Sequence, residues 1–239
     1  MAKTKRFREI EKLFDKETKY SLEDAINILL KSPPVNFDQS IEISIKTGVD
    51  VQKPEQQIRG TVSLPHGTGK QVIVAVLVRG DKAKEATSAG ADYVGSDELL
   101  EKIQGGWMDF STLIATPEMM RDVGKLGKIL GPRGLMPSPK AGTVTNDVAK
   151  AVREVKAGRF EFKTDKNGVI NAIIGKLSFS KEKILENFLE FAKVILDAKP
   201  PTAKGQYIRS AVLSSTMGPG IKLDLGLFTS LLAGKGAES

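Results

Sequence analysis

The order in which two kinds of strand follow one another is the feature that most limits how this chain can fold. SIEISIK (residues 40–46) alternates Ile with polar residues, as a strand does when one face is buried and the other is wet. VIVAVLV (residues 72–78) is apolar on both faces, which is typical of a central strand in a parallel sheet. From Arg159 the alternating pattern returns. The pattern therefore predicts one lobe built from both chain ends and a second lobe inserted into it.

The two ends of the chain contain the elements of an α+β lobe. Ser21 opens a capping box, SLED, before an apolar helix that ends at SPP. RFEFKT and VINAIIG, separated by DKNG, look like the two strands of a hairpin, and a long amphipathic helix follows Ser180. We predict an α+β lobe with an antiparallel sheet, formed by residues 1–67 and 159–239. The residues from Thr229 are small and polar, and we expect them to fray.

The middle of the chain alternates strands with short helices. The strands are VIVAVLV, ADYVG and STLIAT, and we expect helices between and after them, with Ser96 and Thr116 as N-caps. This alternation is typical of βαβ units. We therefore predict an inserted, Rossmann-like α/β lobe with a mainly parallel sheet, formed by residues 68–158. It contains a Gly/Pro-rich basic segment, GKLGKILGPRGLMPSPKAG (residues 124–142).

Composition excludes several classes of site. The chain has 239 residues and no Cys, so it forms no disulfide, uses no thiolate nucleophile and is not a zinc-finger protein. Its single histidine, His66, lies in PHGTG, where we expect a turn or packing role. The longest apolar run, residues 72–78, is far shorter than the ~20 residues that a membrane span needs, and the basic start lacks the apolar region of a secretory signal. We expect a cytoplasmic protein without a membrane partner.

The charge balance raises nucleic acid as a partner. Lys and Arg number 36 against 29 Asp and Glu, which gives a net charge of +7 and a pI of about 9.4, in the range of nucleic-acid-binding domains. Two stretches concentrate this charge: residues 198–223 contain no acid, and residues 121–140 contain five basic residues against one acid. A solvated basic face on an ordinary enzyme has the same pattern, and charge alone leaves both interpretations open.

Enzyme motifs give that alternative no support. The chain has no G-x-G-x-x-G, no G-x-x-x-x-G-K-[ST], no G-x-S-x-G and no H-E-x-x-H. We predict no catalytic residues, no metal ligands and no cofactor. The alternative that remains is a two-lobed α/β enzyme that closes on a phosphorylated metabolite.

Three parts of the sequence carry a family resemblance. They are NFDQSIEISIKTGVD with QIRGTVSLPHGTGK, then GKLGKILGPRGLMPSPKAGTVT, then DKNGVINAIIGKLSFSKEKILENF with KGQYIRSAVLSSTMGPGI. These stretches resemble the L-one family of bacterial large-subunit ribosomal proteins. The resemblance implies a non-enzymatic, ribosome-associated protein of two lobes that binds the stalk region of large-subunit rRNA. It also implies contact with deacylated tRNA leaving the exit site, and repression of translation through the protein's own mRNA leader.

The resemblance implies where RNA binds. In SSTMGPGI (residues 214–221), hydroxyl groups and a small, rigid backbone suit an RNA helix, whose base edges are hidden in a deep groove. A plain turn between two strands is the alternative. Phe37 either stacks on RNA, which the family motif favours, or closes the core. The predicted RNA-binding residues are Phe37, Ser40, Glu42, Lys163, Lys166, Asn171, Ser214, Thr216, Met217 and Gly218.

Two of these residues, Glu42 and Asn171, are unusual at the predicted RNA-binding site. Glu42 would repel phosphate, so we expect it to accept a hydrogen bond from a 2′-hydroxyl or to orient a basic residue. Asn171 stands where members of the family often have histidine, so it keeps a hydrogen-bonding side chain but loses the titratable ring.

For the inserted lobe we expect a secondary, mainly electrostatic contact with a neighbouring rRNA helix or with tRNA. The Gly/Pro-rich segment can follow a phosphate backbone, but it lacks aromatic residues for stacking. A structural loop whose charges face water is the alternative. The predicted contact residues are Lys125, Lys128, Arg133 and Lys140.

Overall fold

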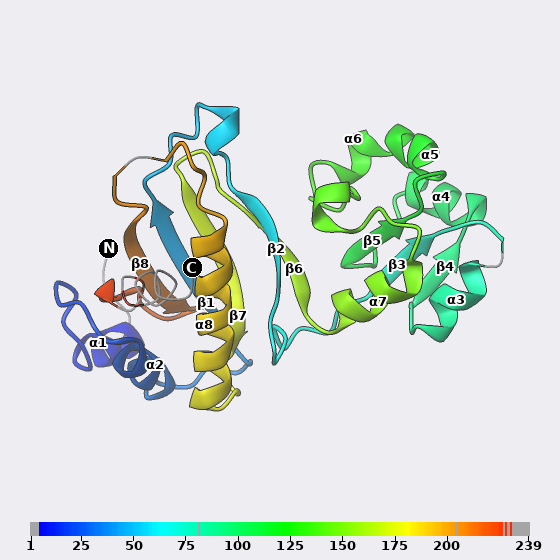
Figure 1. Ribbon diagram of the computed structural model, residues 1–239. Coiled ribbons are helices and arrows are strands. Elements are labelled where there is room, and N and C mark those ends of the chain that lie inside the picture. Colours follow the sequence, from blue (N-terminus) through cyan, green and yellow to red (C-terminus); the bar gives the residue numbers. More distant parts are fainter. Residues whose placement is uncertain (1–4, 81, 204, 227, 229, 231–239) are drawn as a thin grey trace. The chain divides into compact units, whose positions relative to one another are not determined.

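The protein contains an antiparallel sheet built from both chain ends and a separate parallel sheet, as the computed structural model in Figure 1 shows. This confirms the predicted fold class. The chain forms two compact units: unit 1 is residues 1–69 with 162–239, and unit 2 is residues 70–161. Of the tail from Thr229, only Ser230 lies within the described residues. The structure describes residues 5–80, 82–203, 205–226, 228 and 230.

The sheet of unit 1 is centred on β1 (Ser40–Thr47). This strand pairs antiparallel with β7 (Val169–Lys176) on one side and with β8 (Ile208–Ser215) on the other. The short β9 (Ile221–Lys222) extends the sheet beyond β8. All three isoleucines of the alternating pattern in β1 are fully buried, which confirms the predicted half-buried strand.

Two helices cover the buried face of this sheet. α2 (Leu22–Leu30) packs against β8, and α8 (Lys181–Asp197) packs against β7 and α2; Figure 1 shows α8 beside the sheet. The predicted cap is present, because the Ser21 Oγ accepts a hydrogen bond from the Asp24 N–H at 3.2 Å. The first described element is a shorter helix, α1 (Lys5–Glu11).

The predicted hairpin of RFEFKT and VINAIIG forms only next to its turn, where Thr164 and Ile170 make a single antiparallel bridge. Beyond that bridge the predicted pairing is wrong. β6 (Arg159–Lys163) pairs with β2 (Arg59–Ser63), which follows a short 3-10 turn, η1 (Pro54–Gln56), whereas β7 pairs with β1. The DKNG turn itself forms: Gly168 has a φ of +75°, and its N–H donates to the Asp165 carbonyl at 3.1 Å. The turn residues determine where the chain reverses. β7 then pairs with β1, which has eight residues and a regular alternation, rather than with the five residues of β6.

Unit 2 has a three-stranded parallel sheet with β3 (Val74–Leu77) at its centre. β4 (Tyr93–Gly95) pairs on one side and β5 (Thr112–Ala115) on the other. All of β3 is fully buried, as its apolar run predicts. Helices cover both faces: α3 (Lys82–Ser88) and α7 (Val148–Lys156) pack on one, and three others pack on the opposite face.

On that opposite face one helix starts later than predicted, and another starts as predicted but without its side-chain cap. α5 (Met120–Lys125) does not begin at Thr116, whose carbonyl instead accepts a hydrogen bond from the Met119 N–H in a turn. Ser96 directly precedes α4 (Asp97–Gln104), but its side chain makes no capping hydrogen bond. A Thr-Pro pair suits a turn as well as a helix start, and here it forms the turn.

The Gly/Pro-rich segment of unit 2 contains more regular structure than its composition suggests. It holds the short helix α6 (Gly127–Leu130) and a 3-10 turn, η2 (Pro139–Ala141). Leu126 and Leu130 are buried in the core of unit 2. These leucines anchor the segment, so its basic side chains stand on a folded support.

Candidate nucleic-acid interface

On the face of the unit 1 sheet away from α2 and α8, the polar residues of the alternating strands point outward and are exposed or half-buried. In β1, Glu42 lies between Ile173 and Ser214, so the register brings two predicted site residues into one row. In the next row the Ser44 hydroxyl donates to the Asn171 Oδ1 at 2.7 Å, which leaves the NH₂ group of that exposed amide as a donor. We call this surface the open face; its residues are Glu42, Ser44, Lys46, Asn171, Ile173, Ser210, Val212, Ser214 and Lys222.

A tight turn stands at one end of the open face. The Gly218 N–H donates to the Ser215 carbonyl at 2.8 Å, which closes a turn with Thr216 and Met217 at its centre. The Thr216 N–H donates to the Ser40 carbonyl at 3.1 Å, and the Thr216 Oγ1 accepts from the Ser40 N–H at 3.0 Å. The turn is therefore tied to the start of β1 by hydrogen bonds in both directions.

Close packing inside the protein is what requires glycine in this turn. A Cβ at Gly218 would lie 2.2 Å from the Ser215 Oγ, and one at Gly220 would lie 2.9 Å from the Val212 Cγ1. Neither glycine has a positive φ. The expected close approach of Gly218 to RNA remains a prediction.

Two large apolar side chains project beside the turn. Phe37 is 52% exposed and Met217 is 54% exposed, so Phe37 does not close the core. The backbone of Met217 is held, because its N–H donates to the Oε1 of the buried Gln39 at 3.0 Å. Next to Phe37, the Asp38 carboxylate accepts from the Ser178 hydroxyl at 2.8 Å. Exposed apolar groups on fixed backbone suit stacking on bases or covering of sugars.

Two basic residues at this end of the sheet are missing from the sequence prediction. Lys176, at the end of β7, donates from Nζ to the Ser40 Oγ at 3.0 Å. Lys176 could have been predicted from the sequence, because it ends the strand that carries Asn171. Arg6 of α1 donates from Nη1 to the Met217 carbonyl at 2.9 Å across 211 residues of sequence. No local pattern marks Arg6, because only the tertiary fold brings it there.

Lys163 and Lys166 lie at the opposite end of the sheet from the turn. The DKNG loop between them borders the end of β1, where the Thr47 hydroxyl donates to the Gly168 carbonyl at 2.7 Å. Ser40 is at the other end of this 8-residue strand, about 24 Å away at ~3.4 Å per residue. Both lysines are exposed. The structure therefore does not bring them together with Met217.

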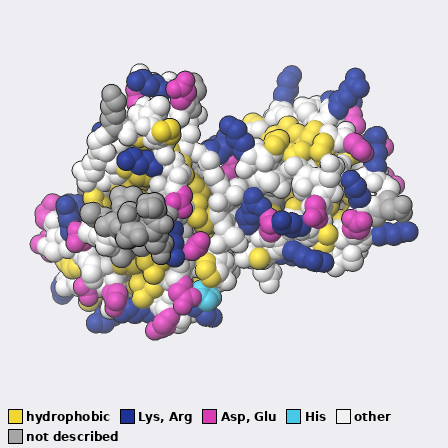
Figure 2. Space-filling model, viewed as in Figure 1, with side chains coloured by type: hydrophobic (Ala, Val, Ile, Leu, Met, Phe, Trp, Pro, Cys, Tyr) yellow, Lys and Arg dark blue, Asp and Glu magenta, His cyan; other side chains and the backbone are white. Residues whose placement is uncertain are grey.

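The four predicted basic residues of unit 2 are all exposed. Lys125 donates from Nζ to Asp122 Oδ1 at 2.9 Å, and this hydrogen bond is the main cause that lowers the pKa of the Asp122 carboxyl. Lys128, Arg133 and Lys140 have no ion pair within the described ranges. Figure 2 shows Lys and Arg side chains beside a hydrophobic patch on the visible face of unit 2.

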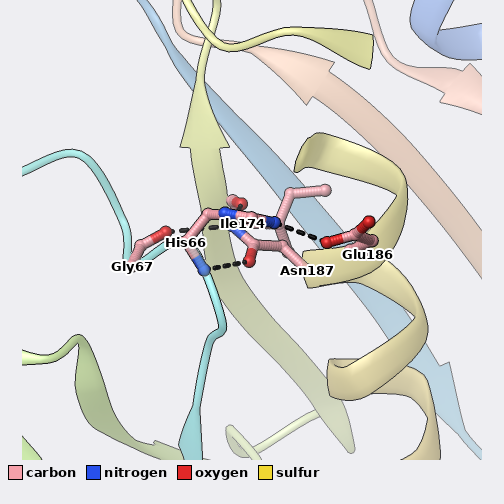
Figure 3. A network of polar contacts seen from close by, with 5 residues as sticks. All are labelled: His66, Gly67, Ile174, Glu186 and Asn187. Atoms are coloured by element: carbon pink, nitrogen blue, oxygen red, sulfur yellow. Dashed lines mark hydrogen bonds and ion pairs between the residues drawn. The ribbon is translucent and has the colours of Figure 1, made fainter. Parts of the chain in front are cut away.

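His66 takes part in a network that joins three segments of unit 1 (Figure 3). The buried Asn187 of α8 accepts from the His66 N–H at 3.1 Å and donates to the carbonyls of Gly67 at 2.9 Å and Ile174 at 2.8 Å. The His66 ring lies 2.5 Å from the Glu186 carboxylate. His66 is exposed and lies in a turn that the Gly67 N–H closes on the Leu64 carbonyl at 3.1 Å, so of the two predicted roles the structure supports the turn.

The described part of the chain holds no group of three or more His, Cys, Asp or Glu side chains that could bind a metal ion. Among the same residues, no helix combines the length and the apolar character that crossing a membrane requires.

The sequence is similar to known ribosomal proteins over most of its length. A sequence model of the "Ribosomal protein L1p/L10e family" matches residues 29–219. The "Large ribosomal subunit protein uL1" of Protochlamydia amoebophila is 60% identical over 222 residues, 93% of this chain and 94% of that protein. The protein of the same name from Chlamydia abortus is 58% identical, covering 92% and 95%, and that from Kosmotoga olearia is 56% identical, covering 93% and 96%.

Proposed function

We propose that this chain, which belongs to the ribosomal protein L1p/L10e family, binds the stalk region of large-subunit rRNA through the open face of unit 1 and the turn beside it. The chain is a structural protein of the large ribosomal subunit and not an enzyme. The alternative of a two-lobed α/β enzyme is therefore wrong. The observation that carries the proposal is the exposure of Phe37 and Met217, together with the hydrogen bonds that hold the Met217 turn against Gln39 and Ser40.

Folded RNA presents shape, phosphates and 2′-hydroxyls rather than readable base edges. A surface that is already rigid loses little conformational entropy when it meets such a partner. The turn offers this, because Ser40 and Gln39 fix its backbone before any ligand arrives. Ser214 and the Asn171 amide add neutral hydrogen-bonding groups to the adjoining face. These features support recognition of RNA by shape.

The charges of the open face support the same assignment. Lys46 belongs to it and Lys176 stands at its turn end, so two cations lie where flanking phosphates would pass. The third lysine of the face, Lys222, is paired with Glu17 at 3.0 Å. Glu42 lies between Ile173 and Ser214 in the register, two residues along β1 from Ser40, whose hydroxyl Lys176 contacts. A carboxylate in that row is suited to accept hydrogen bonds from 2′-hydroxyls. Lys163 and Lys166 would contact phosphates further along the same RNA.

Unit 2 is proposed to make the secondary contact, with a neighbouring rRNA helix or with deacylated tRNA leaving the exit site. The side chains of Lys128, Arg133 and Lys140 are exposed, and within the described residues they have no acidic partner. Replacing Arg133 and Lys140 with alanine is expected to weaken binding of tRNA while leaving the affinity for the stalk fragment almost unchanged. An equal loss for both RNAs would contradict this division of roles.

Repression of the protein's own mRNA would use the same open face. An mRNA leader that folds like the rRNA stalk would compete for one surface, so the two RNAs should displace each other. A chain bound to rRNA in the ribosome therefore could not bind the mRNA leader through this face at the same time.

The test of the proposal is the affinity of the intact chain for a stalk-rRNA fragment in moderate salt, with a duplex of equal length as control. Phe37→Ala and Met217→Ala should each weaken stalk binding by about 1–3 kcal/mol, roughly 5- to 150-fold, the cost of losing one stacked group. Leu13→Ala is the matched control, because Leu13 is 42% exposed in unit 1 but lies outside these elements. Equal affinity for both RNAs, or equal effects of all three substitutions, would contradict the proposal.

A further inference from the structure

Arg6 reaches from α1 to the turn that carries Met217 and to Pro33, at the start of the segment that leads to Phe37. Its Nη1 donates to the Met217 carbonyl at 2.9 Å, in the turn itself. Its Nε donates to the Pro33 carbonyl at 3.2 Å, in the segment that leads to Phe37. One guanidinium therefore bridges two pieces of backbone that are far apart in the sequence.

We propose that Arg6 is a positioning residue for RNA binding: it holds the Phe37 segment and the Met217 turn in one fixed arrangement before RNA arrives. This inference rests on the proposed function of the open face. Arg6 has no contact with RNA in this scheme. It acts by lowering the conformational freedom that the two exposed side chains would otherwise lose on binding.

The chemistry of the contact requires arginine. The planar guanidinium presents several N–H donors in a rigid fork, so two of them can reach carbonyls on different segments at once. A lysine ammonium is a compact charge on a flexible stem and does not keep this geometry. Arg6→Lys therefore removes the bridge and retains the positive charge.

The burial of Arg6 separates it from the basic residues that face solvent. Its Nη2 is buried without a hydrogen-bond partner in the described part of the chain. A buried donor left without a partner costs free energy, and the two hydrogen bonds to Pro33 and Met217 offset that cost. Arg8, on the same helix, is exposed. Arg8 is therefore a suitable control for Arg6: both lie on α1, but Arg6 bridges two segments and Arg8 is exposed to solvent.

The experiment compares Arg6→Lys with Arg8→Lys in the intact chain, using the stalk-rRNA fragment as the probe. Arg6→Lys is expected to weaken binding about tenfold, the effect of one lost charge-assisted hydrogen bond, whereas Arg8→Lys leaves the affinity unchanged. The slope of log affinity against log salt should be the same in the parent and in both variants, because no phosphate contact is lost. Thermal melting checks that each variant is folded, and Arg6→Gln repeats the test without the charge.

A double-mutant cycle distinguishes positioning from general stability. If Arg6 acts through the turn, Arg6→Lys costs much less in a Met217→Ala background than in the parent. Additive losses, or parental affinity in Arg6→Lys, would overturn the inference. Failure of the parent chain itself to prefer the stalk fragment would instead overturn the proposed function on which the inference rests.

Discussion

The hydroxyl of Thr216 is used inside the protein, whatever its relation to RNA. It accepts a hydrogen bond from the Ser40 N–H at 3.0 Å and lies 3.4 Å from the Ser40 carbonyl. The hydroxyl therefore joins the turn to β1, and its removal changes the shape of the surface as well as its donors. This dual role could not be inferred from STMGPG alone, because the partner lies 176 residues away.

Thr216→Val is expected to lower the free energy of unfolding by about 1 kcal/mol, because the Ser40 N–H loses its acceptor while side-chain volume is kept. Thr216→Ser retains the hydroxyl and should recover most of that loss. Urea denaturation of the three proteins measures the difference. The same Val variant should bind stalk RNA more weakly with an unchanged salt slope, since no charge is removed. A Val variant with parental stability would show that the hydrogen bond to Ser40 contributes nothing.

The close packing of Ser215 against Gly218 gives a second prediction for single residues. The Ser215 Oγ is buried without a hydrogen-bond partner in the described part of the chain and lies where a Cβ on residue 218 would stand. Ser215→Ala should be neutral or stabilising by up to about 1 kcal/mol, because it removes an unsatisfied polar group. Gly218→Ala should destabilise the parent by about 1–3 kcal/mol and the Ser215→Ala variant by less. Equal costs in both backgrounds, measured by urea denaturation, would contradict this packing argument.

At the scale of elements, the buried Asn187 joins α8 to β7 and to the segment after β2. It satisfies three backbone groups, those of His66, Gly67 and Ile174. Asn187→Leu fills the space but leaves all three without a partner, and we expect a loss of about 3 kcal/mol. The neighbouring Glu186→Gln is the control and should cost less than about 1 kcal/mol, because the Glu186 side chain is 59% exposed. Comparable losses in the two variants would contradict the importance of Asn187.

Local signals predicted most elements but not all of their partners. The alternation of β1 and the apolar run of β3 correctly indicated one half-buried strand and one fully buried strand. The DKNG signal predicted a turn that forms, but not that β6 and β7 join different sheets. Thr116 shows the same limit, since its Thr-Pro pair fits a helix start and a turn equally well. Strand pairing and helix starts depend on competing contacts that no short stretch contains.

At the scale of the whole molecule, the return of the alternating pattern after Arg159 correctly indicated a sheet shared by both chain ends. The sequence also placed Glu42, Asn171 and Ser214 within strands whose register brings them to one face. It could not show that Lys163, in β6, belongs to a different sheet from that face. It gave no sign of Arg6, whose contact spans 211 residues. The parts of the site that follow strand periodicity were predictable, and those made by tertiary contact were not.

The central claim is that the principal RNA-binding site belongs to unit 1 alone. It is tested most directly by joining residues 1–67 to residues 159–239 through a short glycine linker, which keeps both β2 and β6. Circular dichroism and cooperative urea unfolding first establish that the joined chain is folded. Its affinity for the stalk-rRNA fragment is then measured beside that of the intact chain. We expect the two affinities to agree within about threefold, which is less than 1 kcal/mol; a folded joined chain that binds at least about 100-fold more weakly would contradict the assignment.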